Sequence, residues 1–218
     1  LMAGMFASVG ILAAVRHQAE TGKGQFIDIG MLDTHVAWLA NQGMNYLSTD
    51  KNPERLGNQH PNIVPYQVMP TSDGYIVLSV GNDPTFERFC KLAGEEKLIN
   101  DPKFKTNADR VSNREFVTKV LNEITKKHTS EWWLKELEKE KIGCGPINTL
   151  SQVFSDPHVK AREMIVNMDH KKTGKSPLKL IANPIKMHET PPSYRMPPPL
   201  LGEHTDEILS EKIGLSEA

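Results

Sequence analysis

The stretch NIVPYQVMPTSDGYIVLSVGNDPTFERF, from Asn62 to Phe89, constrains the fold more than any other part of the chain. Its first half alternates β-branched and aromatic residues around Val64–Val68, and a second such run covers Tyr75–Val80. The residues between the two runs are Pro, Thr, Ser, Asp and Gly, which are typical of a tight turn. The pattern therefore predicts an antiparallel hairpin of two strands.

A glycine-containing loop follows the second predicted strand. Gly81-Asn82-Asp83-Pro84 should end the strand, and we expect a helix from Thr85 with Asp83 as its cap. Glycine at the mouth of a helix brings backbone N–H groups close to whatever docks there. Gly81 and Asn82 are therefore candidate ligand-binding residues, although Gly81 could equally serve only to turn the strand into the helix.

Composition sets limits on the functional class. With 218 residues and a formal net charge of −1, the chain can form one large or two small domains and offers no electrostatic basis for binding nucleic acid or a membrane. The two cysteines, Cys90 and Cys144, form no CxxC motif, which favours a reducing compartment and a cytoplasmic location.

The N-terminal region is predicted to belong to a larger α/β domain. Leu1–Val15 carries no charge and is shorter than the roughly 20 residues of a membrane span, so we expect a buried helix that continues to about Ala19. A strand over Gln25–Ile29 and a helix over Thr34–Leu47, capped by Asp33, would complete a helix–strand–helix unit. Because the chain starts inside an apolar helix, we expect it to be the C-terminal part of a longer protein.

The remaining residues predict a small domain and a returning segment. Residues 48–61 are polar and rich in Pro and Gly, so they are interpreted as a linker after the large-domain remnant of residues 1–47. Residues 62–190 are predicted to form a small α+β domain, and residues 191–218 a proline strap and a terminal helix. Within these parts the pattern predicts helices over 113–127, from 130 and over 149–154, a strand over 142–147, a hairpin over 166–181, an extended piece over 183–187 and a helix over 205–213.

Four segments, in the same order, resemble the class III CoA-transferases, the family of formyl-CoA and carnitine CoA-transferases. They are TGKGQFIDIGMLD, PYQVMPTSDGYIVLSVGND with FERFCKLAG, GCGPINTLSQVFSDPHVKAREM and PPPLLGEHTDEIL. The resemblance covers essentially the whole chain. It implies a Rossmann-like large domain with an inserted small α+β domain, and a homodimer of interlocked chains. This chain would be the C-terminal portion of such a protein, without its N-terminal half.

The resemblance also implies a chemistry. Members of the family move CoA from an acyl-CoA to a carboxylic acid through an Asp-linked anhydride and an enzyme-bound thioester. That Asp is expected just upstream of Leu1, so no catalytic residue is expected in this chain, which alone should be inactive. The glycine loop at Gly81 and Asn82 would lie over the active site and close on the acyl intermediate. CoA would be a substrate, with no tightly bound cofactor.

The other polar candidates are interpreted as structural. Asp28 lies in the predicted strand, and Asp33 should cap or hydrogen-bond locally. No pair of histidines has the spacing of a metal site, so no metal site is predicted. Surface or capping roles are expected for His35, His60, His158 and His204. Cys144 is expected to be a buried thiol rather than a nucleophile.

Two alternatives remain open. An α-methylacyl-CoA racemase shares the family fold, and its Asp/His pair would also lie upstream of this chain. The second alternative is that the chain is a non-catalytic fragment or assembly subunit, completed by a separate N-terminal half.

Overall fold

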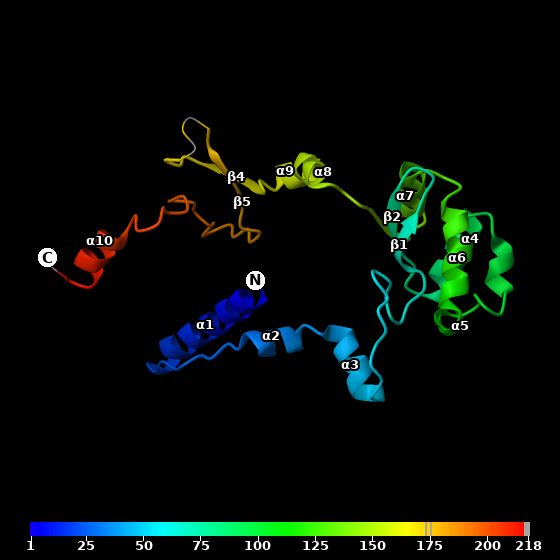
Figure 1. Cartoon of the computed structure of the whole chain (residues 1–218), viewed down its shortest axis with the longest axis horizontal. Helices are drawn as coiled ribbons and strands as arrows, with labels where there is room; N and C mark the ends of the chain where they lie inside the picture. Colours follow the sequence, from blue (N-terminus) through cyan, green and yellow to red (C-terminus); the bar gives the residue numbers. More distant parts are fainter. Residues whose placement is uncertain (173, 175, 216–218) are drawn as a thin grey trace. The chain divides into compact units, whose positions relative to one another are not determined.

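The computed structural model describes residues 1–172, 174 and 176–215 (Figure 1). Contacts between Cα atoms divide the chain into two units, Leu1–Pro146 and Ile147–Ala218. The structure is a mixture of helices with two small antiparallel sheets, which agrees with the predicted α/β class. The four-part division expected above stays a prediction.

The first unit begins with three helices. They are α1 Met2–Thr21, α2 Met31–Ala37 and α3 Ala40–Thr49. The first helix forms where it was predicted, but the burial predicted for it is not found in this chain. Its last residue is Thr21, and the C-cap residue Gly22 has a φ of 71°, in the left-handed region that favours glycine. None of the residues of α1 is buried, although the helix is apolar. Among the described residues, no helix is both long and apolar enough to cross a membrane.

Three predictions for this region were wrong. The strand expected over 25–29 is absent: residues 23–30 form no regular structure, because a strand requires a neighbour to pair with and no described strand lies beside them. The helix expected over 34–47 is two helices, interrupted at Trp38 and Leu39. Asp33 is not the cap of α2, since Gly30 is the N-cap residue and Asp33 lies in the first turn.

The predicted hairpin is confirmed and gains a third strand. β1 Tyr66–Pro70, β2 Tyr75–Ser79 and β3 Gly143–Pro146 form an antiparallel sheet in the order β1-β2-β3. Val68 lies opposite Val77, and Leu78 opposite Cys144. Alternate residues of β1 and β2 are buried, so one face of the sheet contributes to a core.

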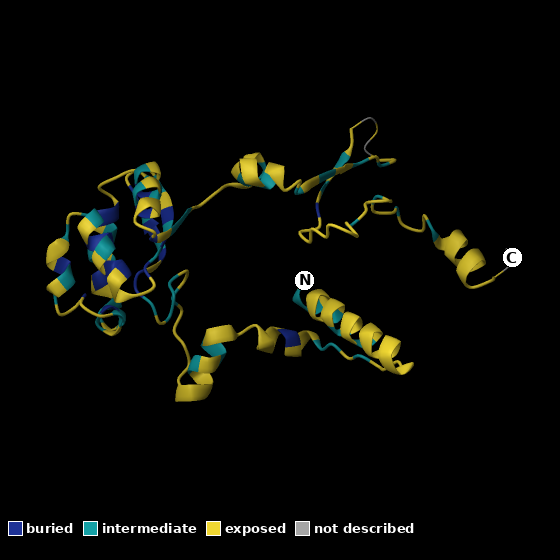
Figure 2. Ribbon diagram, turned by 180° about the vertical axis from the view of Figure 1, so that it is seen from behind, coloured by how far each residue is buried: buried dark blue, intermediate teal, exposed yellow. Residues whose placement is uncertain are grey.

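Helices from the same unit supply the rest of this core. They are α4 Asp83–Leu92, a 3₁₀ turn Glu96–Asn100, α5 Asn107–Ser112, α6 Arg114–Thr125 and α7 Ser130–Lys139. Aromatic rings connect them: Phe89 stacks between Phe86, at 6.4 Å between ring centroids, and Trp133, at 5.8 Å. Figure 2 shows the buried residues gathered in this part of the unit, whereas α1 is almost entirely exposed.

The hairpin turn is fixed to the start of α7 by one carboxylate. Asp73 Oδ1 accepts hydrogen bonds from the Ser130 N–H at 2.7 Å and from the hydroxyls of Ser130 and Thr71, each at 3.0 Å. The bonds from Ser130, first from its backbone and then from its side chain, hold the pKa of Asp73 below its ordinary value. A turn residue thus joins the sheet to a helix distant in sequence.

The second unit contains short elements. They are α8 Leu150–Ser155, α9 Pro157–Ala161, β4 Ile165–Met168, β5 Leu178–Ile181, α10 Thr205–Glu207 and a π-helical turn Ile208–Lys212. The predicted hairpin is confirmed as the antiparallel pair β4–β5, although residues 173 and 175 of its connection lie outside the described residues. Residues 183–187 and the proline-rich 191–199 contain no helix or strand.

The packing of α7 predicts a large cost for truncating its core leucine. Leu137 is fully buried, so Leu137→Ala should lower the free energy of unfolding by about 2–5 kcal/mol, the usual cost of lost burial plus a cavity. The measurement is urea denaturation followed by tryptophan fluorescence. The same change at the exposed Leu201 is the control, and equal effects of the two variants would contradict the packing.

The Asp73 contacts predict a pH dependence. Because the folded pKa lies below the ordinary value of 3.8, the ionised carboxylate stabilises the fold above about pH 4, and this stabilisation is lost as the pH falls through the folded pKa. We expect Asp73→Asn to lower the Tm at pH 7 and to make the Tm fall less steeply between pH 5 and about pH 2. Glu87→Gln, at an exposed position of α4, is the control, and identical acid profiles for Asp73→Asn and the unaltered chain would refute the assignment.

Candidate functional site

The glycine loop leaves the end of β2 and starts α4. Val80 is buried, and its N–H donates to Pro65 O at 2.9 Å, so the chain is fixed up to the residue before Gly81. Gly81 itself is exposed, and a Cβ placed on it would have no atom within 4 Å. Its φ lies outside the left-handed region. Neither backbone strain nor packing within this chain therefore requires a glycine at this position.

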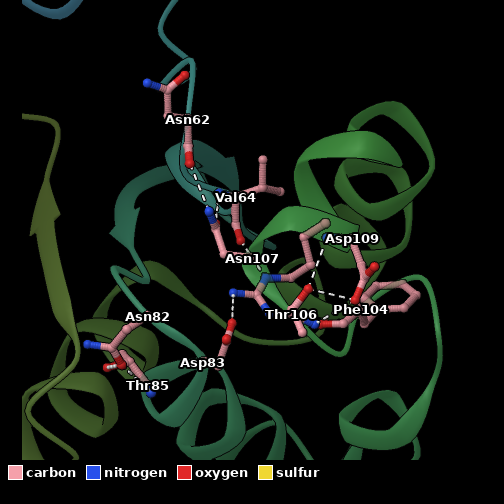
Figure 3. Close-up of polar contacts among 10 residues, drawn as sticks. Asn62, Val64, Asn82, Asp83, Thr85, Phe104, Thr106, Asn107 and Asp109 are labelled. Carbon is pink, nitrogen blue, oxygen red and sulfur yellow. Dashed lines mark hydrogen bonds and ion pairs between the residues drawn. The ribbon is translucent and has the colours of Figure 1, made fainter.

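Asn82, rather than Asp83, caps α4. Its Oδ1 accepts from the Thr85 N–H at 2.9 Å and from the Thr85 hydroxyl at 2.8 Å, and its backbone is extended (Figure 3). The helix begins at Asp83, two residues earlier than predicted, because the Asn82 oxygen already satisfies the Thr85 donor. The capping bond fixes the side-chain oxygen of Asn82, while the residue remains exposed.

The capping arrangement limits which backbone donors the loop can offer. Pro84 has no N–H group, and the N–H of Thr85 is bonded to Asn82. The N–H of Phe86 donates to Asn82 O at 3.0 Å within the helix. The N–H groups that could meet a ligand are therefore those of residues 81–83, at the positive end of the α4 dipole.

A buried arginine holds the start of α4 through an ion pair. Arg110 is completely buried, and its Nη2 lies 2.9 Å from Asp83 Oδ1. Its other nitrogens donate to backbone oxygens, Nε to Val64 O at 2.7 Å and Nη1 to Phe104 O at 2.8 Å. The guanidinium also lies 4.3 Å from the centroid of the Phe86 ring. Each of the three nitrogens of this buried cation thus has a hydrogen-bond acceptor, and one of the acceptors is a carboxylate.

Arg110 was not among the residues predicted from the sequence to belong to a site. The signal that could have placed it is Thr106-x-x-Asp109, which forms a capping box at the start of α5: each side chain bonds the backbone of the other residue. Asn107 adds two bonds, accepting from Val64 N–H at 3.1 Å and donating to Asn62 O at 2.8 Å (Figure 3). This short helix therefore positions both Arg110 and the segment that enters β1.

The remaining acidic and histidine candidates do not gather into a site. The Asp33 carboxylate lies beside Gly30 at the start of its own helix: a Cβ added to Gly30 would be 2.6 Å from Asp33 Oδ2. His35 Nδ1 lies 2.7 Å from Met31 O in the same helix. His60 stacks on Tyr66 at 5.3 Å between ring centroids. These contacts are local, and they do not join the three residues into a common site.

The candidates of the second unit are equally local. His204 pairs with Glu207 at 3.3 Å, one helical turn later. His158 lies in the first turn of α9, where its N–H donates to Asp156 Oδ1 at 2.7 Å. Among the described residues, no three Cys, His, Asp or Glu side chains are arranged to hold a metal ion.

The two cysteines have the properties of unreactive thiols. Burial raises the pKa of Cys90 to about 12, which leaves it protonated at neutral pH. Cys144 is half-buried on β3, and burial, followed by the charge of Glu138, raises its pKa as well. Its Sγ lies 3.8 Å from Leu134 O. Cys144 was predicted to be buried and is only half-buried.

Comparison with known proteins identifies the family. The family model for CoA-transferase family III matches residues 1–205. The chain is 39% identical over 97% of its length to the succinate–glutarate CoA-transferase of Agrobacterium fabrum, and 37% identical over 97% to the human succinyl-CoA:glutarate CoA-transferase. It covers 52% and 48% of those proteins, so it spans about half the length of the curated relatives it matches.

A solved structure shows the same relationship in three dimensions. A CAIB/BAIF family protein from Brucella suis matches with a TM-score of 0.74 at 39% identity, over 97% of this chain and 54% of that one. The family model covers most of the chain, and the relatives agree with it over nearly all residues. The chain therefore belongs to CoA-transferase family III.

Proposed function

We propose that this chain is part of a CoA-transferase, which moves CoA from an acyl-CoA donor to a carboxylic acid acceptor. The observation that carries the proposal is the family match over residues 1–205, together with relatives that are named as such enzymes. The names of these relatives support succinyl-CoA as the donor and a dicarboxylic acid such as glutarate as the acceptor. The same names favour transfer over the racemase alternative.

The reaction requires a nucleophile that the chain's own candidates do not supply. In the proposed mechanism an Asp carboxylate attacks the thioester carbonyl, and the CoA thiolate leaves to give a mixed anhydride. The thiolate then attacks the anhydride, which releases the first acid and forms an enzyme thioester. Asp28 lies in the α1–α2 connection and Asp33 in the first turn of α2. The family resemblance, rather than these positions, is our reason to place the nucleophile in the polypeptide expected before Leu1.

The exposed apolar helices support a requirement for further polypeptide. The exposed apolar side chains of α1 include Val9 and Leu12, at 67% and 70%, and Phe26 in the loop that follows is 92% exposed. An apolar helix is normally covered by other protein. We propose that the missing N-terminal half covers these side chains, that the complete protein is an interlocked homodimer, and that the chain is inactive without that half.

Within this scheme the glycine loop is the substrate-binding part of the chain. We propose that Gly81 and Asn82 lie against the acyl group, with the backbone N–H groups of the loop directed at developing negative charge. The space at Gly81 supports this role, because no neighbour in the chain explains why a side chain is absent there. The cytoplasmic location stays a prediction that rests on the two free cysteines.

The proposed function predicts that the complete protein transfers CoA. The protein extended by its N-terminal half should form glutaryl-CoA from succinyl-CoA and glutarate without ATP, and the 218-residue chain alone should form none. The measurement is liquid chromatography of the CoA esters. Addition of hydroxylamine should trap the activated Asp and stop turnover, with a matching mass change on that residue. Transfer by the 218-residue chain alone would contradict the proposed place of the nucleophile.

A second prediction separates function from folding at the glycine loop. Gly81→Ala should leave the Tm unchanged, because its Cβ enters open space at an ordinary φ, yet it should lower the transfer rate. Gly94→Ala is the matched control: Gly94 has φ +66°, so the change should cost about 1–2 kcal/mol of stability through strain while the rate of the folded enzyme is kept. If Gly81→Ala transfers CoA at the normal rate, Gly81 does not approach the substrate.

A further inference from the structure

Arg88 connects the glycine loop to a segment that lies far away in sequence. It lies on α4, one turn after Thr85, and is half-buried. Its Nη2 donates to Thr85 Oγ1 at 3.1 Å, and its Nε donates to Glu140 O at 3.1 Å. Nη1 lies 3.5 Å from Pro84 O in the first turn of the same helix. All three acceptors are uncharged oxygens, so the guanidinium serves here as a forked hydrogen-bond donor.

The bond to Thr85 extends to the candidate site. The Thr85 hydroxyl accepts from Arg88 and donates its single O–H to Asn82 Oδ1 at 2.8 Å. Four residues thus form a continuous relay, Glu140–Arg88–Thr85–Asn82. The Asn82 oxygen is held by two bonds, one from the Thr85 backbone N–H and one from the Thr85 hydroxyl, and Arg88 orients the hydroxyl that makes the second bond.

The far end of the relay is the connection that leads into β3. Glu140 ends α7, and Lys141 follows with φ 55° before the buried Ile142. Gly143 then pairs with Ser79, the last residue of β2. The glycine loop leaves this end of β2, so Arg88 spans the two backbone segments that meet at the same end of the sheet.

We propose that Arg88 is a positioning residue, which holds Gly81 and Asn82 against the Glu140–Gly143 segment in the geometry that the acyl group requires. This inference rests on the proposed function of the loop. Arg88 differs from Arg110 in its burial: Arg110 has no exposed surface and supports the core, whereas Arg88 is half-buried. Removal of Arg88 should therefore loosen the loop and leave the fold intact.

The test compares Arg88→Met and Arg88→Lys with Lys91→Met in the complete enzyme. Lys91 is an exposed cation of the same helix and controls for lost charge. Hydrogen exchange of residues 80–86 and 140–143 reports the loop geometry, and the Tm reports the fold. Steady-state kinetics separate kcat from the KM of the acyl-CoA.

Arg88→Met should accelerate exchange in residues 80–86 and lower kcat by about 10-fold to 100-fold, as small misplacements of catalytic groups do, with little change in KM or Tm. Arg88→Lys should recover part of kcat, because one ammonium group can reach only one end of the relay. Lys91→Met should behave as the unaltered enzyme.

Three results would overturn the inference. The first is unchanged hydrogen exchange of residues 80–86 in Arg88→Met. The second is faster exchange in Arg88→Met with a normal kcat. The third is a loss of kcat in Lys91→Met equal to that in Arg88→Met. If the unaltered complete enzyme transfers no CoA, the proposed function fails instead, and the exchange data alone then decide whether Arg88 holds the loop.

Discussion

The part of the structure that carries the glycine loop depends on one buried cation. Arg110 lies beneath the start of α4 and bonds three segments at once: Asp83 in α4, Val64 before β1, and Phe104 in the loop before α5. A buried guanidinium without these partners would be strongly destabilising, so the three segments must meet for the fold to form. The stacking of Phe86 on the same group adds the aromatic core to the assembly. Loop, sheet and core are thereby positioned together.

The two supports of the loop differ in character. Arg110 acts from the core, where its charge is neutralised by Asp83 and its remaining donors meet backbone oxygens. Arg88 acts near the surface and contacts only uncharged acceptors. The loop between them has an open position at Gly81. A loop that is held by such contacts and leaves space beside Gly81 is the arrangement expected of a ligand-binding loop.

Local chemistry made much of this predictable from the sequence. The hairpin followed from alternation and turn residues, and α6 and α7 from helical spacing. Predictions failed where a residue's partner lies elsewhere. Asp83 was predicted to cap α4, but its carboxylate pairs with Arg110 and Asn82 caps the helix instead. The strand expected over 25–29 needs a neighbour that the described residues do not supply. Arg88 gives no local signal, because one of its acceptors, Glu140 O, follows the end of α7, far away in sequence.

The order of strands in the sheet has a consequence for folding. β1 and β2 are joined by a tight turn, so their pairing closes only a short loop and can begin as soon as these residues leave the ribosome. β3 pairs with β2 only after α4 to α7 have been made, since these helices separate the two strands in the chain. The segment that receives Arg88 immediately precedes β3. The two strands of the hairpin are therefore available for pairing before the segment that supports the glycine loop through Arg88 has been synthesised.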